Sequence, residues 1–276
     1  MSLRQIYLLI FIVILSLILR VYKLDSVPPS ISWDEAAVGY NSWTVANYGR
    51  DEYGKFLPLF FRSFGDDKHP VHVYITAIST KFLGLNEFST RLPSALFGVL
   101  NVLLIYFLAK LLFRKEIIAQ IAALFLAISP YNLHFSRFNH EANFVLAFFL
   151  SGLVLFHLSF RWKLLLPVSF FSFIICFLAY HPAKIVVPFI ILILICLYFK
   201  KLLSNRSGMV GSLIILIVFF FIIKNNPQLL GLARVGQTAL GKNEIEKTLL
   251  FQLSHNELLG RLNLIAIQYS WHFSPK

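Results

Sequence analysis

Acidic residues are scarce in this sequence, with only 13 among 276 residues, and charged residues of both signs make up 14% of it. A soluble globular domain usually carries about 25% charged residues. Apolar residues instead account for 58% of the chain, and its mean hydropathy is +0.72. This composition excludes an ordinary soluble domain and indicates an integral membrane protein.

Cysteine is nearly absent as well. The two cysteines, Cys176 and Cys196, lie inside apolar runs, where they are expected to be small core residues rather than a disulfide framework or a zinc site. The sequence also lacks a P-loop, a dinucleotide-binding glycine pattern and a nucleophile elbow. Nucleotide hydrolysis and serine hydrolase chemistry therefore have no support.

Long apolar runs dominate what is present. They approach the length of a membrane-spanning helix and exceed the roughly ten-residue alternating segments of a membrane barrel. We therefore expect an all-α, polytopic transmembrane helical bundle whose first run is an uncleaved anchor. The seven expected spans are Ile6–Leu19, Ser94–Phe113, Ile117–Leu133, Ala142–Phe160, Leu164–Tyr180, Ile185–Phe199 and Met209–Ile223.

The apolar segment Pro70–Gly84 decides the topology. If it spans the membrane, the basic residues of the later loops face outward; if it lies in the interface, they face the cytoplasm together with Arg4. The positive-inside rule favours the second arrangement. Apolar residues recur along one side of this segment and polar residues along the other, so we expect an amphipathic helix on the membrane surface.

This topology places the N-terminus inside and the segments 22–91, 134–141, 180–184 and 225–276 outside. We expect residues 1–276 to form a single transmembrane module that is the N-terminal part of a longer protein, in a prokaryotic plasma membrane. The net charge of +12 falls mostly in short loops, where it orients helices and contacts anionic lipid. The lipid bilayer is therefore the expected partner of this charge, and nucleic acid is not.

Six of the 13 acidic residues lie between Trp33 and Pro70. Ser32 and Glu35 have the spacing of a capping box, which predicts a helix from Trp33 to Gly49 with Asp34 and Glu35 in its first turn. A well-capped helix without further function is the alternative. The helix dipole favours the ionised form of both carboxylates, which makes Asp34 a weaker base. Binding a cation or orienting a substrate are then alternative roles for Asp34.

Three further elements complete the candidate site. Pro70 suits the first turn of the amphipathic helix, which would direct Asp67, Lys68 and His69 toward the same surface. Arg137 and Glu141 lie at a membrane boundary, where they either face a cavity or form a salt bridge with each other. His181 and Lys184 either join the site or form an ordinary turn with a snorkelling lysine.

The order of these elements resembles the GT-C-type membrane glycosyltransferases, in particular the dolichyl-phosphate-mannose protein mannosyltransferases and the bacterial aminoarabinose transferases. The elements are an outer Asp-Glu pair, an acidic-basic-Pro element, Arg91-Leu92-Pro93 leading into a span, and Ser136-Arg137 followed by Glu141. The likeness covers most of residues 20–185. Val71 replaces a second proline of the family pattern, and Glu141 stands where the family usually has Asp.

The resemblance implies a sugar transferred from a polyprenyl-phosphate donor to a hydroxyl of a protein, lipid or glycan acceptor. It places Asp34, with Glu35 beside it, and Glu141 in the catalytic centre, and Lys68 against the lipid phosphate. Residues Asp67, His69, Arg137, His181 and Lys184 are expected to assist in binding. A divalent cation held by carboxylates is left open. The alternative function is a transporter or flippase of a lipid-linked or anionic solute, although the span interiors contain almost no charged residues.

Overall fold

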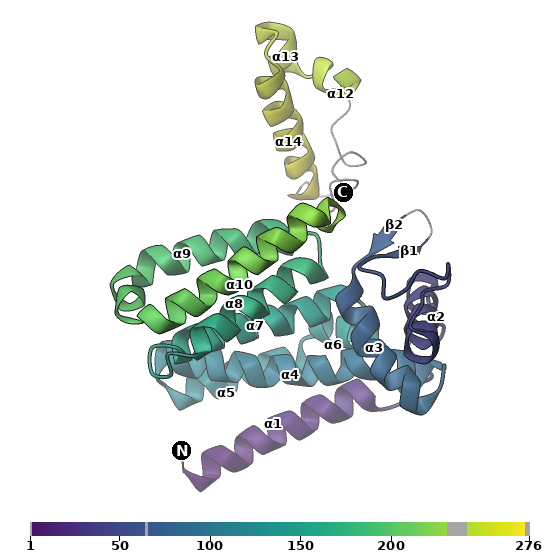
Figure 1. Ribbon diagram of the computed structural model, residues 1–276, viewed down its shortest axis with the longest axis vertical. Coiled ribbons are helices and arrows are strands. Elements are labelled where there is room, and N and C mark those ends of the chain that lie inside the picture. Colours follow the sequence, from purple (N-terminus) through teal and green to yellow (C-terminus); the bar gives the residue numbers. More distant parts are fainter. Residues whose placement is uncertain (1, 64–65, 231–241, 274–276) are drawn as a thin grey trace. The chain divides into compact units, whose positions relative to one another are not determined.

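The computed structural model describes residues 2–63, 66–230 and 242–273 and is almost entirely helical (Figure 1). The helices of the first part of the chain are α1 (Leu3–Val21), α2 (Trp33–Tyr48), α3 (Pro70–Leu83), α4 (Glu87–Phe113), α5 (Glu116–Ile128), α6 (Pro130–Arg137), α7 (Glu141–Leu158), α8 (Leu165–Ala179), α9 (Ala183–Ser204) and α10 (Arg206–Asn225). A short antiparallel hairpin, β1 (Phe61–Ser63) and β2 (Asp66–Lys68), precedes α3. The expected all-α membrane bundle is confirmed apart from this small hairpin.

Two compact units make up the chain, residues Met1–Leu229 and Leu230–Lys276. The first contains all the helices named above and ends within the 3-10 turn Pro227–Leu230. The second contains α12 (Lys242–Glu246), α13 (Leu249–Ser254) and α14 (Glu257–Phe273). All the candidate site residues belong to the first unit.

Five described helices are long and apolar enough to cross a membrane, namely α1, α4, α7, α9 and α10. Helix α8 is apolar but has only 15 residues. Helix α3 is not among these candidate spans, in agreement with the surface helix expected over Pro70–Gly84. Its polar residues His72, Thr76 and Thr80 are buried against the protein, whereas Ile78 and Phe82 are exposed.

The expected span Ile117–Leu133 is not one straight helix: α5 and α6 are together apolar enough to cross a membrane, but they meet at a bend of 57°. Pro130 has no N–H and cannot donate to the carbonyl of Leu126 as the next helical turn would require. The buried guanidinium of Arg20 donates to that carbonyl instead, at 3.2 Å, and to the carbonyl of Ala127 at 3.0 Å. The backbone therefore stays satisfied at the break, as membrane depth requires.

Helix α4 also differs from expectation, since it begins at Glu87 rather than Ser94. Asn86 accepts a hydrogen bond from the N–H of Ser89, and the Ser89 hydroxyl accepts from the N–H of Asn86. This reciprocal cap starts the helix seven residues early and places Pro93 inside it. As a result Arg91 lies on the helix rather than in the loop before it.

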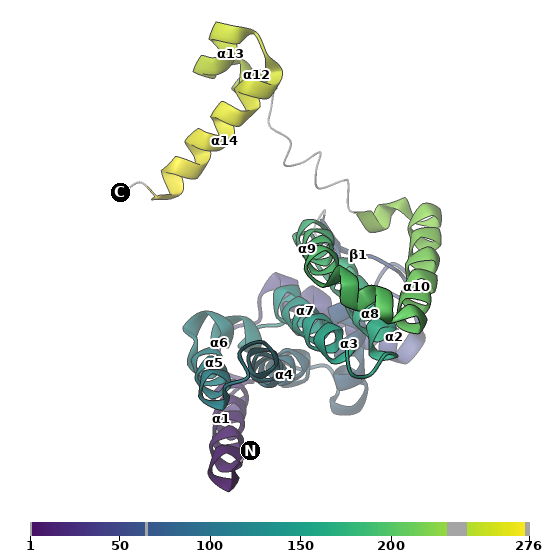
Figure 2. The ribbon, with the colours of Figure 1, turned by 90° about the vertical axis from the view of Figure 1, so that its left-hand side faces the viewer.

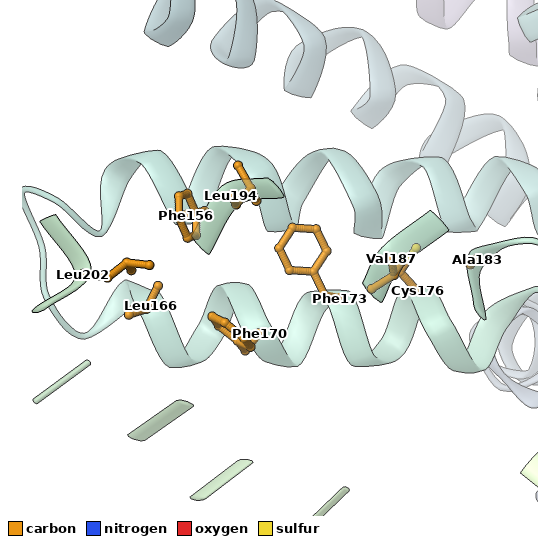
Figure 3. Close-up of a cluster of buried hydrophobic side chains, with 9 residues drawn as sticks. All are labelled: Phe156, Leu166, Phe170, Phe173, Cys176, Ala183, Val187, Leu194 and Leu202. Carbon is orange, nitrogen blue, oxygen red and sulfur yellow. The ribbon is translucent and has the colours of Figure 1, made fainter. Parts of the chain in front are cut away.

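The bundle helices lie side by side, with α2, α3 and the hairpin at one end (Figure 1). The turns α4–α5, α7–α8 and α9–α10 lie at the other end, so the basic loops gather on one side as expected. Figure 2 views several bundle helices end-on. The largest core cluster joins α7, α8 and α9 through Phe156, Phe173 and Leu194, among others (Figure 3).

Candidate active site

The first turn of α2 presents Asp34 to the outside of the protein. As predicted, Ser32 caps the helix: its hydroxyl accepts from the N–H of Glu35 at 3.1 Å, and the Glu35 carboxylate accepts from the N–H of Ser32 at 3.2 Å. Gly49 ends the helix with φ of 67°. The Asp34 side chain is 44% exposed and pairs with the ammonium of Lys68 at 3.0 Å.

Glu35 points the other way, into the protein. Its carboxylate is buried and accepts from the Arg91 guanidinium at 2.9 and 3.2 Å and from the N–H of Asn139 at 3.3 Å. The remaining Arg91 N–H groups donate to the carbonyls of Leu24, Pro28 and Ser30. This contact set gives Glu35 a structural role: it ties the start of α2 to α4 and to the loop before α7.

Two histidines at the start of α3 form the interior of the site. His69 and His72 are 2% and 1% exposed, and His69 Nε2, His72 Nδ1 and His72 Nε2 have no hydrogen-bond partner. Burial, together with the positive charges of Lys184 and His181, lowers the pKa of His69 to about 3. Burial likewise lowers the pKa of His72. Both rings are therefore neutral at pH 7, and each carries one N–H donor and one acceptor nitrogen.

The charges of Glu141 and Asp34 both affect the pKa of the His72 ring. Burial is the main cause that lowers the pKa of His72; the negative charges of Glu141 and Asp34 raise it, and the positive charges of His140 and Lys68 lower it. Asp34 and Lys68, which pair with each other, and Glu141 therefore all lie within electrostatic range of the His72 ring. His140 caps α7, its Nδ1 accepting from the N–H of Ala142 at 3.1 Å.

The α8–α9 turn closes the other side of the histidine pair. The His181 ring lies 4.4 Å from that of His69, measured between ring centroids, and the Lys184 ammonium lies 3.4 Å from His181 Nδ1. Both residues were predicted on sequence grounds to belong to the site, and the structure places them beside His69. The half-buried lysine beside these imidazoles offers positive charge to an anionic ligand.

Two predicted site residues are placed differently. Arg137 donates to the backbone carbonyls of Leu19, Tyr22, Lys23 and Val27 and so fixes the segment after α1. The alternative Arg137–Glu141 salt bridge does not occur among the described ion pairs. Asp67 lies in β2, opposite Arg62, and its side chain is outside the described part of the structure.

Sequence reasoning did not identify three residues of this region: His72, Arg91 and Asn139. His72 was assigned only to the polar side of a surface helix, and Arg91 only to a motif. Asn139 donates to the Thr76 hydroxyl at 2.8 Å and to the carbonyl of Thr90 at 2.6 Å. The polar spacing of His72 and Thr76 was the available signal, because a polar helix side can face a polar site as well as water.

An apolar cavity of about 240 Å³ begins beside the polar residues. It lies between α7, α8 and α9, and its lining includes Ala142, next to Glu141, and Pro182, next to His181. Farther from the site the lining is formed by Phe149, Cys176 and Val187, among others. The cavity is therefore lined by residues next in sequence to Glu141 and His181.

Metal ligands do not assemble among the described residues. No group of three His, Cys, Asp or Glu side chains there is placed to hold an ion. The Asp66 and Asp67 side chains, which the sequence offered as ligands, are outside the described set. We therefore derive no chemical step through a metal.

Comparisons with known proteins agree with this geometry. The family model described as dolichyl-phosphate-mannose-protein mannosyltransferase matches residues 67–223, more than half of the chain. The putative mannosyltransferase YkcB of Bacillus subtilis is 38% identical over 101 residues, covering 34% of this chain and 14% of YkcB.

A solved structure shares the fold. The archaeal oligosaccharyltransferase AglB from Archaeoglobus fulgidus, in complex with an inhibitory peptide and a dolichol-phosphate, matches with a TM-score of 0.54 at 17% identity. The match covers 98% of this chain and 37% of the AglB chain. The chain therefore spans well under two thirds of the length of both relatives.

Proposed function

Since this chain belongs to the dolichyl-phosphate-mannose-protein mannosyltransferase family, we propose that it is the site-bearing part of an integral membrane glycosyltransferase. It transfers a sugar of the hexosyl or mannosyl type from a polyprenyl-phosphate donor to a hydroxyl of a protein, lipid or glycan acceptor. The site faces outward from a prokaryotic plasma membrane, where a lipid-linked donor replaces the nucleotide sugars of the cytoplasm. The Asp34–Lys68 pair beside the buried histidines is the observation that carries this proposal.

The reaction needs two groups of opposite charge. The bond between the sugar and the phosphate oxygen breaks, the acceptor oxygen bonds to the sugar, and the acceptor proton must leave. Asp34 is exposed enough to meet an acceptor hydroxyl and takes its proton, with Glu141 nearby as the second carboxylate. Lys68 stabilises the departing phosphate.

The buried histidines extend the phosphate site inward. A neutral imidazole N–H donates to a phosphate oxygen without the desolvation cost of burying a further cation. His69 and His72 lack protein partners for three ring nitrogens, and the Lys184 ammonium adds positive charge on the far side of His69. These groups are well placed to hold the leaving phosphate.

The apolar cavity lined by Ala142 and Pro182 suits the isoprenoid chain of the donor. An apolar chain in this cavity, with its phosphate at the histidines, leaves the sugar toward Asp34 and the acceptor side. The dolichol-phosphate in the AglB structure gives a precedent for such a ligand on this fold. Glu35 takes no part in the chemistry in this proposal, because its carboxylate is held by Arg91.

The test is sugar transfer from a polyprenyl-phosphate donor in membranes that contain the protein. We expect Asp34→Asn to lower the transfer rate about 100-fold or more, the usual effect of losing a general base. Asp25→Asn, another exposed carboxylate of the same outer segment, is the matched control and should transfer normally. Near-normal transfer by Asp34→Asn would overturn the assignment.

A further inference from the structure

A patch of positive charge lies at the end of the bundle opposite the candidate active site. The α7–α8 and α9–α10 turns, which Figure 1 shows at that end, carry Arg161, Lys163 and Arg206, and the last turns of α9 add Lys200 and Lys201. All five are exposed, and the sequence contains no acidic residue between Glu141 and Glu244. No neighbouring carboxylate from these turns neutralises the patch.

The two turns are held together by Asn205. Its amide donates to the carbonyl of Lys163 at 3.3 Å and to that of Ser159 at 3.5 Å. Gly208 fits closely against this contact, since a Cβ there would lie 2.6 Å from the Lys163 carbonyl oxygen. The charges of both turns therefore form one patch rather than two.

An apolar cavity of about 330 Å³ lies beside this patch, between α8, α9 and α10. Its lining begins at Leu166, three residues after Lys163, and includes Leu202, which follows Lys201, and Met209, three residues after Arg206. Figure 3 shows Leu166 and Leu202 close together at one end of the core cluster. Ser212 is the polar member of the lining, and its hydroxyl already donates to the carbonyl of Gly208 at 2.8 Å.

We propose that the patch and the cavity together bind an anionic phospholipid, with its phosphate at the basic turns and an acyl chain between α8, α9 and α10. An apolar lining provides no hydrogen-bond partners for a polar ligand, whereas burying a hydrocarbon chain in it is favourable. Basic residues at the ends of membrane helices attract anionic head groups. Trp162, between Arg161 and Lys163, is 61% exposed, as expected of an aromatic side chain at head-group depth.

This site is separate from the proposed donor site, which lies at the other end of α7 and α9. Native mass spectrometry of the purified protein, mixed with phosphatidylglycerol or with phosphatidylcholine of the same acyl chains, compares the two head groups directly. We expect the protein to retain phosphatidylglycerol preferentially. Neutralising two charges with Lys163→Gln and Arg206→Gln should lower this retention roughly 30-fold, at about 1 kcal/mol per charge.

Matched variants separate this site from general attraction of charge. Arg114→Gln with Lys115→Gln removes two charges from the α4–α5 turn, which lies outside the cavity lining, and should leave retention unchanged. Val210→Trp fills the cavity and should lower retention of phosphatidylglycerol. Ile217→Trp, equally exposed at 58% but outside the lining, should not.

Equal retention of the two lipids by the unmodified protein would overturn the proposal. So would an equal loss in the Arg114/Lys115 variant, or full retention in Val210→Trp. Should the Lys163/Arg206 variant fold poorly, salt provides a second measurement on the unmodified protein. Raising the ionic strength should weaken retention of phosphatidylglycerol, because exposed charges are screened, and an unchanged retention would contradict head-group binding.

Discussion

Asp34 and Glu35 are neighbours in the chain with opposite environments. Asp34 is 44% exposed and pairs with Lys68, whereas the Glu35 side chain is 1% exposed and pairs with Arg91. Successive residues of a helix point about 100° apart, so neighbours at the edge of a buried face can have opposite environments. The acidic pair is thus one exposed carboxylate, to which we assign the base of the proposed reaction, and one buried carboxylate held in an ion pair.

Replacing Arg91 and replacing Glu35 should lower the stability of the protein by different amounts. Arg91→Met leaves a buried carboxylate and three backbone carbonyls without their donor, so we expect a loss of about 3–5 kcal/mol. Glu35→Gln keeps the carbonyl contacts of Arg91 and should cost less. Thermal unfolding of the purified protein in detergent gives the order. Arg261→Met, which breaks the exposed pair with Glu257, is the control and should change little.

His69 predicts a loss of stability in mild acid. Its pKa falls from the usual 6.5 to about 3 because of burial, so between these values the unfolded chain binds a proton that the folded protein does not. Stability must then decrease as the pH is lowered from 6.5 toward 3, by at most about 1.4 kcal/mol per pH unit for one group. Midpoints of thermal unfolding between pH 7 and pH 5 measure this slope.

The variant His69→Gln isolates that contribution. It should show a shallower fall in midpoint than the unmodified protein over the same pH range, while His134→Gln, at an exposed position, should keep the original slope. Identical slopes for all three proteins would mean that His69 does not remain neutral in the folded state.

At the scale of helices, the site depends on a tight crossing of α4, α6 and α1. A Cβ at Gly98 would lie 2.4 Å from the Cβ of Ser136 and 2.7 Å from Nε of Arg20. Neither neighbour can move freely, since Ser136 is on α6 and Arg20 holds the carbonyls at the end of α5. Glycine at this position lets α4 approach the bend between α5 and α6.

Gly98→Ala is therefore expected to destabilise the protein by about 1–3 kcal/mol, the usual cost of overpacking. Gly39→Ala is the comparison, because its Cβ would meet the Thr90 hydroxyl at 2.7 Å, at the end of a side chain. We expect a smaller decrease of the thermal midpoint for Gly39→Ala. A midpoint for Gly98→Ala equal to that of the unmodified protein would contradict the crossing described here.

At the scale of the whole molecule, the basic turns and the candidate site lie at opposite ends of the bundle (Figure 1). The positive-inside rule then predicts that the α4–α5 turn is cytoplasmic and the segment before α2 is outside. In a background with Cys176 and Cys196 replaced by Ser, Asp25→Cys should react with a membrane-impermeant maleimide on intact cells. Lys115→Cys should react only after permeabilisation, and the reverse pattern would invert the proposed topology.

Composition and hydrophobic runs alone determined the class of this protein, because helices in a membrane must satisfy their own backbone and cover themselves with apolar side chains. Local signals were equally sufficient for α2, whose Ser32 cap and Gly49 end were both predicted and confirmed. They also predicted that Pro70 begins α3, as it does. These features depend on neighbouring residues or on the solvent.

Only the tertiary structure decided which polar residues meet. Glu35 and Arg91 are 56 positions apart, and Arg20 reaches carbonyls more than 100 positions away, so nothing local identifies these partners. The same is true of His72, which was expected on the polar side of a surface helix but is buried, with its ring 6.2 Å from that of Phe144 in α7. The burial and the electrostatic environment of a site residue depend on segments that are distant in sequence, and only the folded structure brings those segments together.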